Sequence, residues 1–212
     1  MNWVDGVLLA LLLASVIVGS KKGLVRELMA FVIFFAAIIF SVSYIDNFAV
    51  YVYEKLGGSP LTSAFLSFIL LLAASYAVFK ILGLVFYKVA DIKTAKKRDQ
   101  MGGALIGFLR GWATIGFLTF LVFLLPLPEA FYEDFEASFF GPTVAKTVPL
   151  MYESTSAIHK GGATFIDQVE NTLIVAPANV DTGTDMGAED RTEVYRVLYQ
   201  IDRFFNLSRE TS

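Results

Sequence analysis

The sequence predicts an all-α integral membrane protein, in which four transmembrane helices are followed by a C-terminal helical tail outside the membrane. Composition is the first observation behind this prediction. The 212 residues are 56% hydrophobic and 17% charged, with a mean hydropathy of +0.61. Soluble domains have about 45–50% apolar and about 25% charged residues. The second observation is a series of long, almost uncharged stretches, since a helix needs about 20 apolar residues to cross a membrane.

The four-helix transmembrane module is predicted over residues 1–128. Its spans lie at about residues 3–19, 28–45, 61–87 and 103–125. Because lipid offers peptide groups no hydrogen-bond partner, each span must be a helix or belong to a closed barrel. The spans are continuously apolar rather than alternating, which excludes the barrel.

The basic residues of the short links predict the orientation of the module. The first link, residues 20–27, and the link between the third and fourth spans are rich in Lys and Arg, whereas residues 46–60 contain only Lys55. Cytoplasmic loops carry an excess of Lys and Arg, so both termini are expected outside the cytoplasm. Nothing resembling the basic start of a signal peptide precedes the first span, and we expect that span to remain as an anchor.

The tail from residue 129 onward is acidic, with 14 acidic and 6 basic side chains. Residues 129–176 predict short helices on the outer face of the membrane, and residues 177–189, rich in Pro, Asp, Thr and Gly, predict a linker. Residues 190–207 predict an amphipathic helix, because apolar residues recur at intervals of three and four after a capping-box pattern. This helix could bind a partner, cover the outer face of the module or lie on lipid.

Three glycines, Gly103, Gly107 and Gly111, recur at every fourth residue of the fourth span. On a helix they share one face, where the absence of side chains lets another helix approach closely. The alternative is a pore-lining or gating helix that slides on its glycines. The spacing alone does not separate these two hypotheses.

Two charged residues, Asp5 and Arg110, lie inside predicted spans. A charge in the middle of a bilayer costs a few kcal/mol, and we expect Arg110 to anchor the inner end of the fourth helix. Asp5 is expected to be a helix N-terminal charge favoured by the helix dipole, with a proton relay as the alternative. Their different depths argue against a direct pair.

The sequence offers no pattern typical of catalysis. It contains no cysteine and one histidine, and no phosphate-binding loop, serine elbow, catalytic carboxylate pair or metal-ligand cluster is found. We therefore expect no enzymatic activity, no cofactor and no bound metal. The net charge of −3 also argues against a nucleic-acid partner, and the lipid bilayer is the partner that the composition predicts.

Three short motifs resemble those of the colicin V production protein family, CvpA. The first runs from Asp5-Gly6 to the segment KGLVRE at residues 22–27, the second is GGALIGFLRG at residues 102–111, and the third is SFFGP at residues 138–142. Their order, their spacing and the four spans together make the resemblance, which covers about residues 1–155. The cytoplasmic part of the first motif supplies four further candidate residues, namely Lys22, Gly23, Arg26 and Glu27.

The resemblance implies a protein of the bacterial inner membrane. Together with the basic links, which predict both termini outside the cytoplasm, it gives a multi-pass protein with both termini periplasmic. It also implies a non-enzymatic role in colicin V or other toxin production and export, and in envelope homeostasis. The alternative is a small oligomeric channel or transporter. The candidate partners are a second copy of the chain and a protein of the export machinery or the envelope.

Overall fold

The computed structural model describes residues 2–90, 97–156, 163–175 and 188–208. Within these ranges every regular element is helical and no strand is present, which confirms the predicted all-α class. Four helices are long and apolar enough to cross a membrane. They are α1 (Trp3–Lys22), α2 (Leu24–Leu56), α3 (Pro60–Ala90) and α4 (Lys97–Phe123).

The connections between the first three helices are shorter than the sequence analysis predicted. Residues 20–27 and 46–60 were predicted as links, but only Gly23 separates α1 from α2, and only residues 57–59 separate α2 from α3. Gly23 and Gly57 have φ angles of 83° and 63°, in the left-handed region where glycine ends a helix without strain. Hydropathy marks where apolar sequence stops, whereas these glycines mark where the helices stop.

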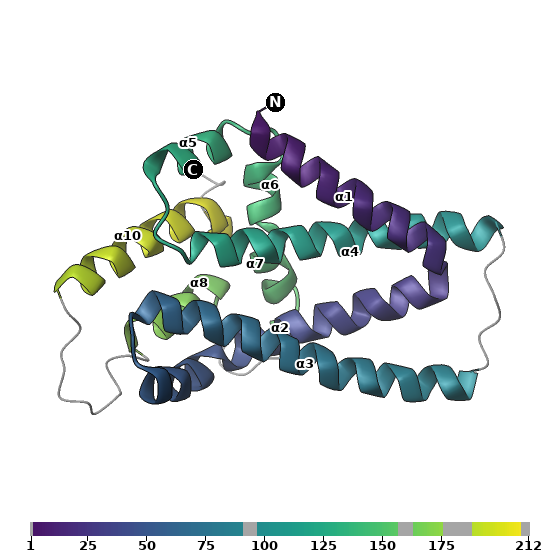
Figure 1. The fold of residues 1–212 in the computed structure, drawn as a ribbon, viewed down its shortest axis with the longest axis horizontal. Helices are drawn as coiled ribbons and strands as arrows, with labels where there is room; N and C mark the ends of the chain where they lie inside the picture. The colour runs from purple at the N-terminus through teal and green to yellow at the C-terminus, as the bar shows by residue number, and fades with distance from the viewer. Residues whose placement is uncertain (1, 91–96, 157–162, 176–187, 209–212) are drawn as a thin grey trace.

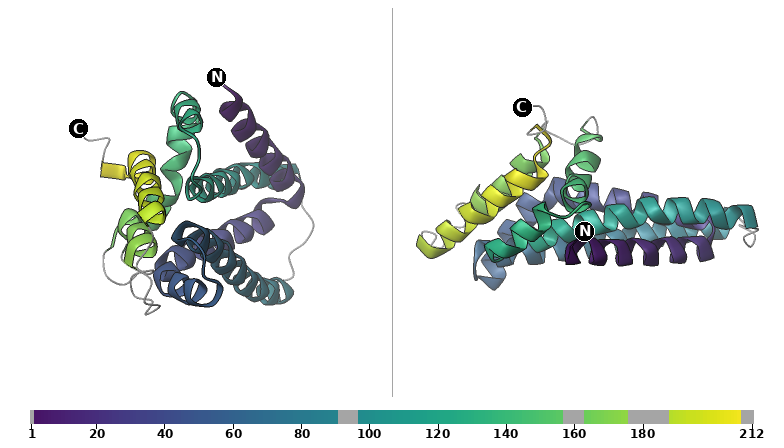
Figure 2. Two further views of the ribbon diagram at one scale, coloured as in Figure 1. Left: turned by 60° about the vertical axis from the view of Figure 1, so that its left-hand side comes forward. Right: turned by 90° about the horizontal axis from the view of Figure 1, so that it is seen from above.

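The four long helices form two pairs (Figure 1). Helix α1 packs along α4, and α2 packs antiparallel to α3 across their short turn. Helix α2 also contacts α4 and so joins the two pairs, while α1 and α3 lie on opposite sides of the bundle (Figure 2). Helix α4 is therefore the central element, and half of its membrane window is buried within the structure.

The tail gathers at the end of the bundle where α4 finishes (Figures 1 and 2), and we call this part the cap. Its elements are α5 (Glu129–Glu136), α6 (Gly141–Ala145), α7 (Thr147–Glu153), α8 (Phe165–Glu170), the π-helical turn η1 (Asn171–Val175) and α10 (Ala188–Phe205). Most of the predicted linker, residues 177–189, lies outside the described residues. The predicted last helix, residues 190–207, corresponds to α10.

An aromatic cluster holds the cap on α4. It consists of Phe120, Phe123, Phe131, Tyr132, Phe135, Phe165, Phe204 and Phe205. The ring of Phe123 is the centre, with centroids 4.9 Å from Phe135 and 5.2 Å from both Phe204 and Phe205. Such edge-to-face contacts add to the free energy gained by burying the rings themselves.

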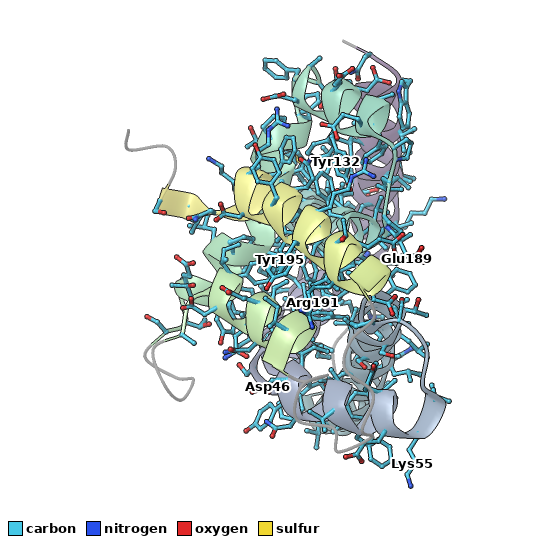
Figure 3. The ribbon with its side chains drawn as sticks, turned by 90° about the vertical axis from the view of Figure 1, so that its left-hand side faces the viewer. Asp46, Lys55, Tyr132, Glu189, Arg191 and Tyr195 are labelled. Atoms are coloured by element: carbon cyan, nitrogen blue, oxygen red, sulfur yellow. The ribbon has the colours of Figure 1, made fainter. Side chains whose placement is uncertain are left out.

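The amphipathic helix α10 turns its apolar side toward this cluster. Val194, Val197 and Ile201 are buried there, whereas Tyr195 is exposed on the outer side, which faces the viewer in Figure 3. At the edge, Arg203 forms an ion pair with Glu136 of α5. Of the three alternatives for this helix, the structure places it over the end of the module.

Candidate functional site

The glycines of α4 lie against α1, where the backbones of the two helices approach closely. A Cβ atom on Gly107 would lie 2.9 Å from the Cα atom of Gly19, and one on Gly111 would lie 2.6 Å from the Cβ atom of Ser15. A Cβ atom on Gly103 would lie 2.8 Å from the carbonyl carbon of Gly23. No larger residue fits at these positions unless the helices separate.

Helix α1 contributes its own small residues to this contact. The Ser15 hydroxyl donates a hydrogen bond of 2.8 Å to the Gly107 carbonyl, and Gly19 lies four residues further along. Small residues at this spacing are typical of close helix contacts in membranes. Ser15 and Gly19 are not among the candidates predicted from the sequence, although their spacing was the signal that could have identified them.

The structure also joins two candidates that the sequence analysis assigned to different places. Glu27, in the first turn of α2, is completely buried. Its Oε1 atom lies 2.5 Å from Nε of Arg110, and its Oε2 atom lies 3.8 Å from Nζ of Lys22. From the sequence, Glu27 is expected in a cytoplasmic loop, and Arg110 is expected to anchor the inner end of the fourth helix. The structure instead pairs them inside the bundle.

Arg110 lies close to the middle of the span Asp99–Phe123, where an unpaired charge would be costly. The Glu27 carboxylate reduces this cost by providing the opposite charge, and only 18% of the Arg110 side chain remains exposed. Lys22 and Arg26 of the same motif are exposed. The motif therefore divides into two basic residues at the surface and one acidic residue inside.

The start of α2 is held to α4 by a further contact that the sequence analysis missed. The Leu24 backbone N–H donates a 2.8 Å hydrogen bond to the Asp99 carboxylate in the first turn of α4. This bond satisfies one of the amide groups that a helix N-terminus leaves without an intrahelical partner. Nothing in the sequence around Asp99 identifies Leu24 as its partner, because the two are distant along the chain.

Asp5 connects α1 to the cap. Its Oδ1 atom accepts hydrogen bonds of 2.9 and 3.0 Å from the backbone N–H groups of Phe139 and Phe140. Its Oδ2 atom accepts a 3.1 Å bond from the Asn2 N–H, as part of a capping box at the start of α1. Asp5 is therefore in the first turn, as a helix N-terminal charge would be, and it also binds the third family-like motif.

That motif forms a tight turn of its own around Ser138. The Ser138 hydroxyl accepts a 2.9 Å hydrogen bond from the Gly141 N–H and donates a 2.7 Å bond to the Phe135 carbonyl. A Cβ atom on Gly141 would lie 2.6 Å from the same carbonyl oxygen. The turn thus presents two adjacent N–H groups to a single carboxylate oxygen of Asp5.

An apolar groove of about 540 Å³ runs between α2, α3 and α4. Arg110 and Thr114 contribute polar atoms to its lining, and Phe34, Leu72 and Phe117 are among its apolar residues. Across the described parts of the chain, no group of three or more His, Asp or Glu side chains could hold a metal ion.

Comparison with known proteins identifies the family. Residues 4–149 match the family model described as Colicin V production protein. The chain is also 26% identical to an uncharacterized transmembrane protein of Bacillus subtilis (strain 168), YshB, over 139 residues, which is 58% of this chain and 78% of that protein. No solved structure gives a significant match. The match covers more than half of the chain and includes all three motifs described above, so this protein belongs to the colicin V production protein family.

Proposed function

We propose that this protein is a non-enzymatic component of the bacterial inner membrane that supports colicin V or related toxin production and export, and envelope homeostasis. The proposal is supported by the contacts of three charged side chains of the long helices, each of which binds another part of the chain. Glu27 binds Arg110, and Asp5 binds the backbone of the cap. Side chains used in this way favour a structural or assembly role over a reaction centre.

The surface of the helices provides room for such assembly. Large apolar side chains of α1, α2 and α3 are exposed, for example Leu13, Val32 and Val78. In a membrane this surface contacts lipid, a second copy of the chain, or a protein of the export machinery or envelope. The apolar side of α10 is already covered, so we place the partner surface on the membrane helices.

A complementation experiment tests this function. A strain that lacks its own member of the family and carries a colicin V production system would receive the wild-type chain or a variant. We expect the wild type to restore both secreted toxin and resistance to detergent. Gly6→Ala should restore them equally, because a Cβ atom there meets nothing within 4 Å, whereas Gly107→Leu should restore neither. A correctly inserted wild-type chain that restores neither property would contradict the proposal.

We further propose that both termini are periplasmic, because the links rich in Lys and Arg then face the cytoplasm. Alkaline phosphatase, which is active outside the cytoplasm, and green fluorescent protein, which fluoresces inside it, can be fused after Ser212. We expect active phosphatase and no fluorescence. The reverse result would invert the orientation without affecting the family assignment.

The alternative function is a small oligomeric channel or transporter. The groove between α2, α3 and α4 favours it, since Arg110 and Thr114 line a space of about 540 Å³ that a second copy would enclose. Flux across liposomes containing the wild-type protein, together with its reduction by Leu118→Trp in the groove lining, would support this function. Absence of flux under ion gradients and under membrane tension would exclude it.

A further inference from the structure

A second groove, of about 690 Å³, lies between α2, α3 and the cap, and we call it the α2 groove. Its lining changes character along α2. The apolar part contains Phe35, Ala36, Ile39, Phe40 and Phe79, and the polar part contains Ser43, Tyr44, Asp46, Asn47, Thr155 and Gln168. The polar part lies beside the cap, where Thr155 and Gln168 come from the segments around α7 and α8.

The change from apolar to polar lining has the direction expected of a groove that runs from the bilayer interior to the interface. Helix α2 rises by about 1.5 Å per residue, so the lining from Phe35 to Asn47 extends over roughly 18 Å. Phe40 and Phe79 lie edge to face across α2 and α3, with centroids 6.3 Å apart. The apolar part therefore lies toward the bilayer interior, and the polar part lies toward the interface at the cap. A lipid has the same arrangement, because its apolar hydrocarbon chain lies in the bilayer interior and its polar headgroup lies at the interface.

The polar part of the α2 groove offers hydrogen-bond acceptors. Gln168 is only 8% exposed, and its Oε1 atom is buried and accepts no hydrogen bond from any described residue. A buried amide oxygen without a donor is unfavourable, so a donor from a ligand would stabilise it. Gln168 thus points to a ligand that carries N–H or O–H groups.

Asp46 adds negative charge at the same end. Its Oδ1 atom accepts a 2.8 Å hydrogen bond from the Asn47 N–H, and within the described ranges no Lys or Arg forms an ion pair with it. Among the described residues, the lining of the α2 groove also contains no Lys or Arg. The complementary headgroup is a cation that donates hydrogen bonds, which a primary ammonium does and a bare phosphate does not.

We propose that the α2 groove binds a membrane lipid with a primary ammonium headgroup. The ammonium binds at Asp46 and Gln168, and a hydrocarbon chain lies along Phe35, Ile39 and Phe79. This inference does not rest on the proposed function. A peptide or the helix of a second copy would fill the apolar part equally well, but the acceptors at the polar end favour the aminolipid.

Native mass spectrometry of the full chain with defined lipids tests the proposal. Phosphatidylethanolamine carries a primary ammonium, phosphatidylcholine has a trimethylated one without N–H groups, and phosphatidylglycerol has none. We expect the wild type to retain phosphatidylethanolamine about tenfold better than the other two, the difference produced by one charge-assisted hydrogen bond. Equal retention of the three lipids would overturn the proposal.

Two pairs of variants separate the headgroup from the chain. Asp46→Asn should remove the preference for phosphatidylethanolamine, whereas Glu54→Gln, an exposed residue of α2 outside the groove, should keep it. Ala36→Leu should weaken retention of phosphatidylethanolamine by filling the apolar part, and Val32→Leu, on the exposed surface, should not. Unchanged melting temperatures in detergent show that the variants fold. A folded Asp46→Asn protein that retains the full preference would contradict the proposed headgroup site.

Discussion

The burial of Glu27 depends on its position in the first turn of α2. Lys22 and Arg26 beside it are exposed, yet Glu27 is completely buried. Gly23 and Glu27 are four residues apart and both are buried, as expected for neighbours on one side of a helical turn. The tight turn at Gly23 places the first turn of α2 beside α4, where Arg110 receives the carboxylate.

Removing one partner of this pair should destabilise the protein strongly. Glu27→Gln leaves Arg110 without its counter-charge, and Arg110→Met leaves the buried Glu27 carboxylate with only the exposed Lys22 at 3.8 Å. We expect each variant to lose about 3–5 kcal/mol in the free energy of unfolding. The double variant should lose much less than the sum of the two. Unfolding in mixed detergent micelles, analysed as a double-mutant cycle, measures this coupling. Additive losses would show that the two side chains do not interact.

The contact between Asp5 and the cap can be tested by hydrogen exchange at individual backbone amides. Asp5→Ala removes both carboxylate oxygens, so the backbone N–H groups that donate to them lose their acceptor. We expect a loss of about 1–3 kcal/mol. Hydrogen exchange should accelerate at Phe139 and Phe140, which donate to Asp5. Glu133→Gln, at an exposed position of α5, is the control, and equal exchange in both variants would refute the assigned contact.

At the scale of elements, the contact between α1 and α4 depends on backbone approach rather than on side-chain volume. Gly107→Ala places a methyl group 2.9 Å from the Gly19 Cα atom, whereas Gly6→Ala on α1 meets nothing within 4 Å. We expect Gly107→Ala to cost about 1–3 kcal/mol through overpacking and Gly6→Ala to be neutral or stabilising. Thermal unfolding of both variants in one detergent measures the difference. Equal stability would mean that the helices do not approach this closely.

Helix α2 extends beyond the span that hydropathy predicts. Its 33 residues extend about 50 Å, more than the roughly 30 Å of a hydrocarbon core. The predicted span 28–45 follows the apolar part, but the helix continues to Leu56, and α2 contacts α7, α8 and η1 of the cap. Hydropathy does not record such contacts between elements.

At the scale of the whole molecule, we expect the cap to make its end of the bundle sensitive to alkaline pH. Burial raises the pKa of Tyr132 and Tyr152 above the ordinary value of 10.0. The folded state therefore favours the neutral phenols. Their contribution to stability is fully present below the unfolded pKa and is lost as the pH rises through the raised folded pKa.

The melting temperature in detergent, measured from about pH 8 to about pH 11 on either side of the ordinary tyrosine pKa, tests this contribution. We expect it to fall with increasing pH in the wild type and to fall less in Tyr132→Phe and Tyr152→Phe. Tyr195→Phe, at an exposed position of α10, should behave as the wild type does. Identical pH profiles for all four proteins would show that the buried phenols are not responsible.

The sequence by itself determined the membrane class, the four apolar helices, the amphipathic last helix and the family-like motifs. Each depends on composition or on spacing within one segment, where the 3.6-residue helical repeat relates sequence to surface. The glycines of α4 were identified for the same reason, although their partners Ser15 and Gly19 on α1 were not.

Only the tertiary structure decided which of these segments meet. Glu27 with Arg110, Asp5 with the Phe139 and Phe140 amides, and α10 with the aromatic cluster all join residues that are distant along the chain. Such contacts depend on how helices cross and where turns fall, and a one-residue turn at Gly23 is enough to move a charged side chain from a loop to the interior. Local sequence patterns do not contain that information, because it arises from packing between segments.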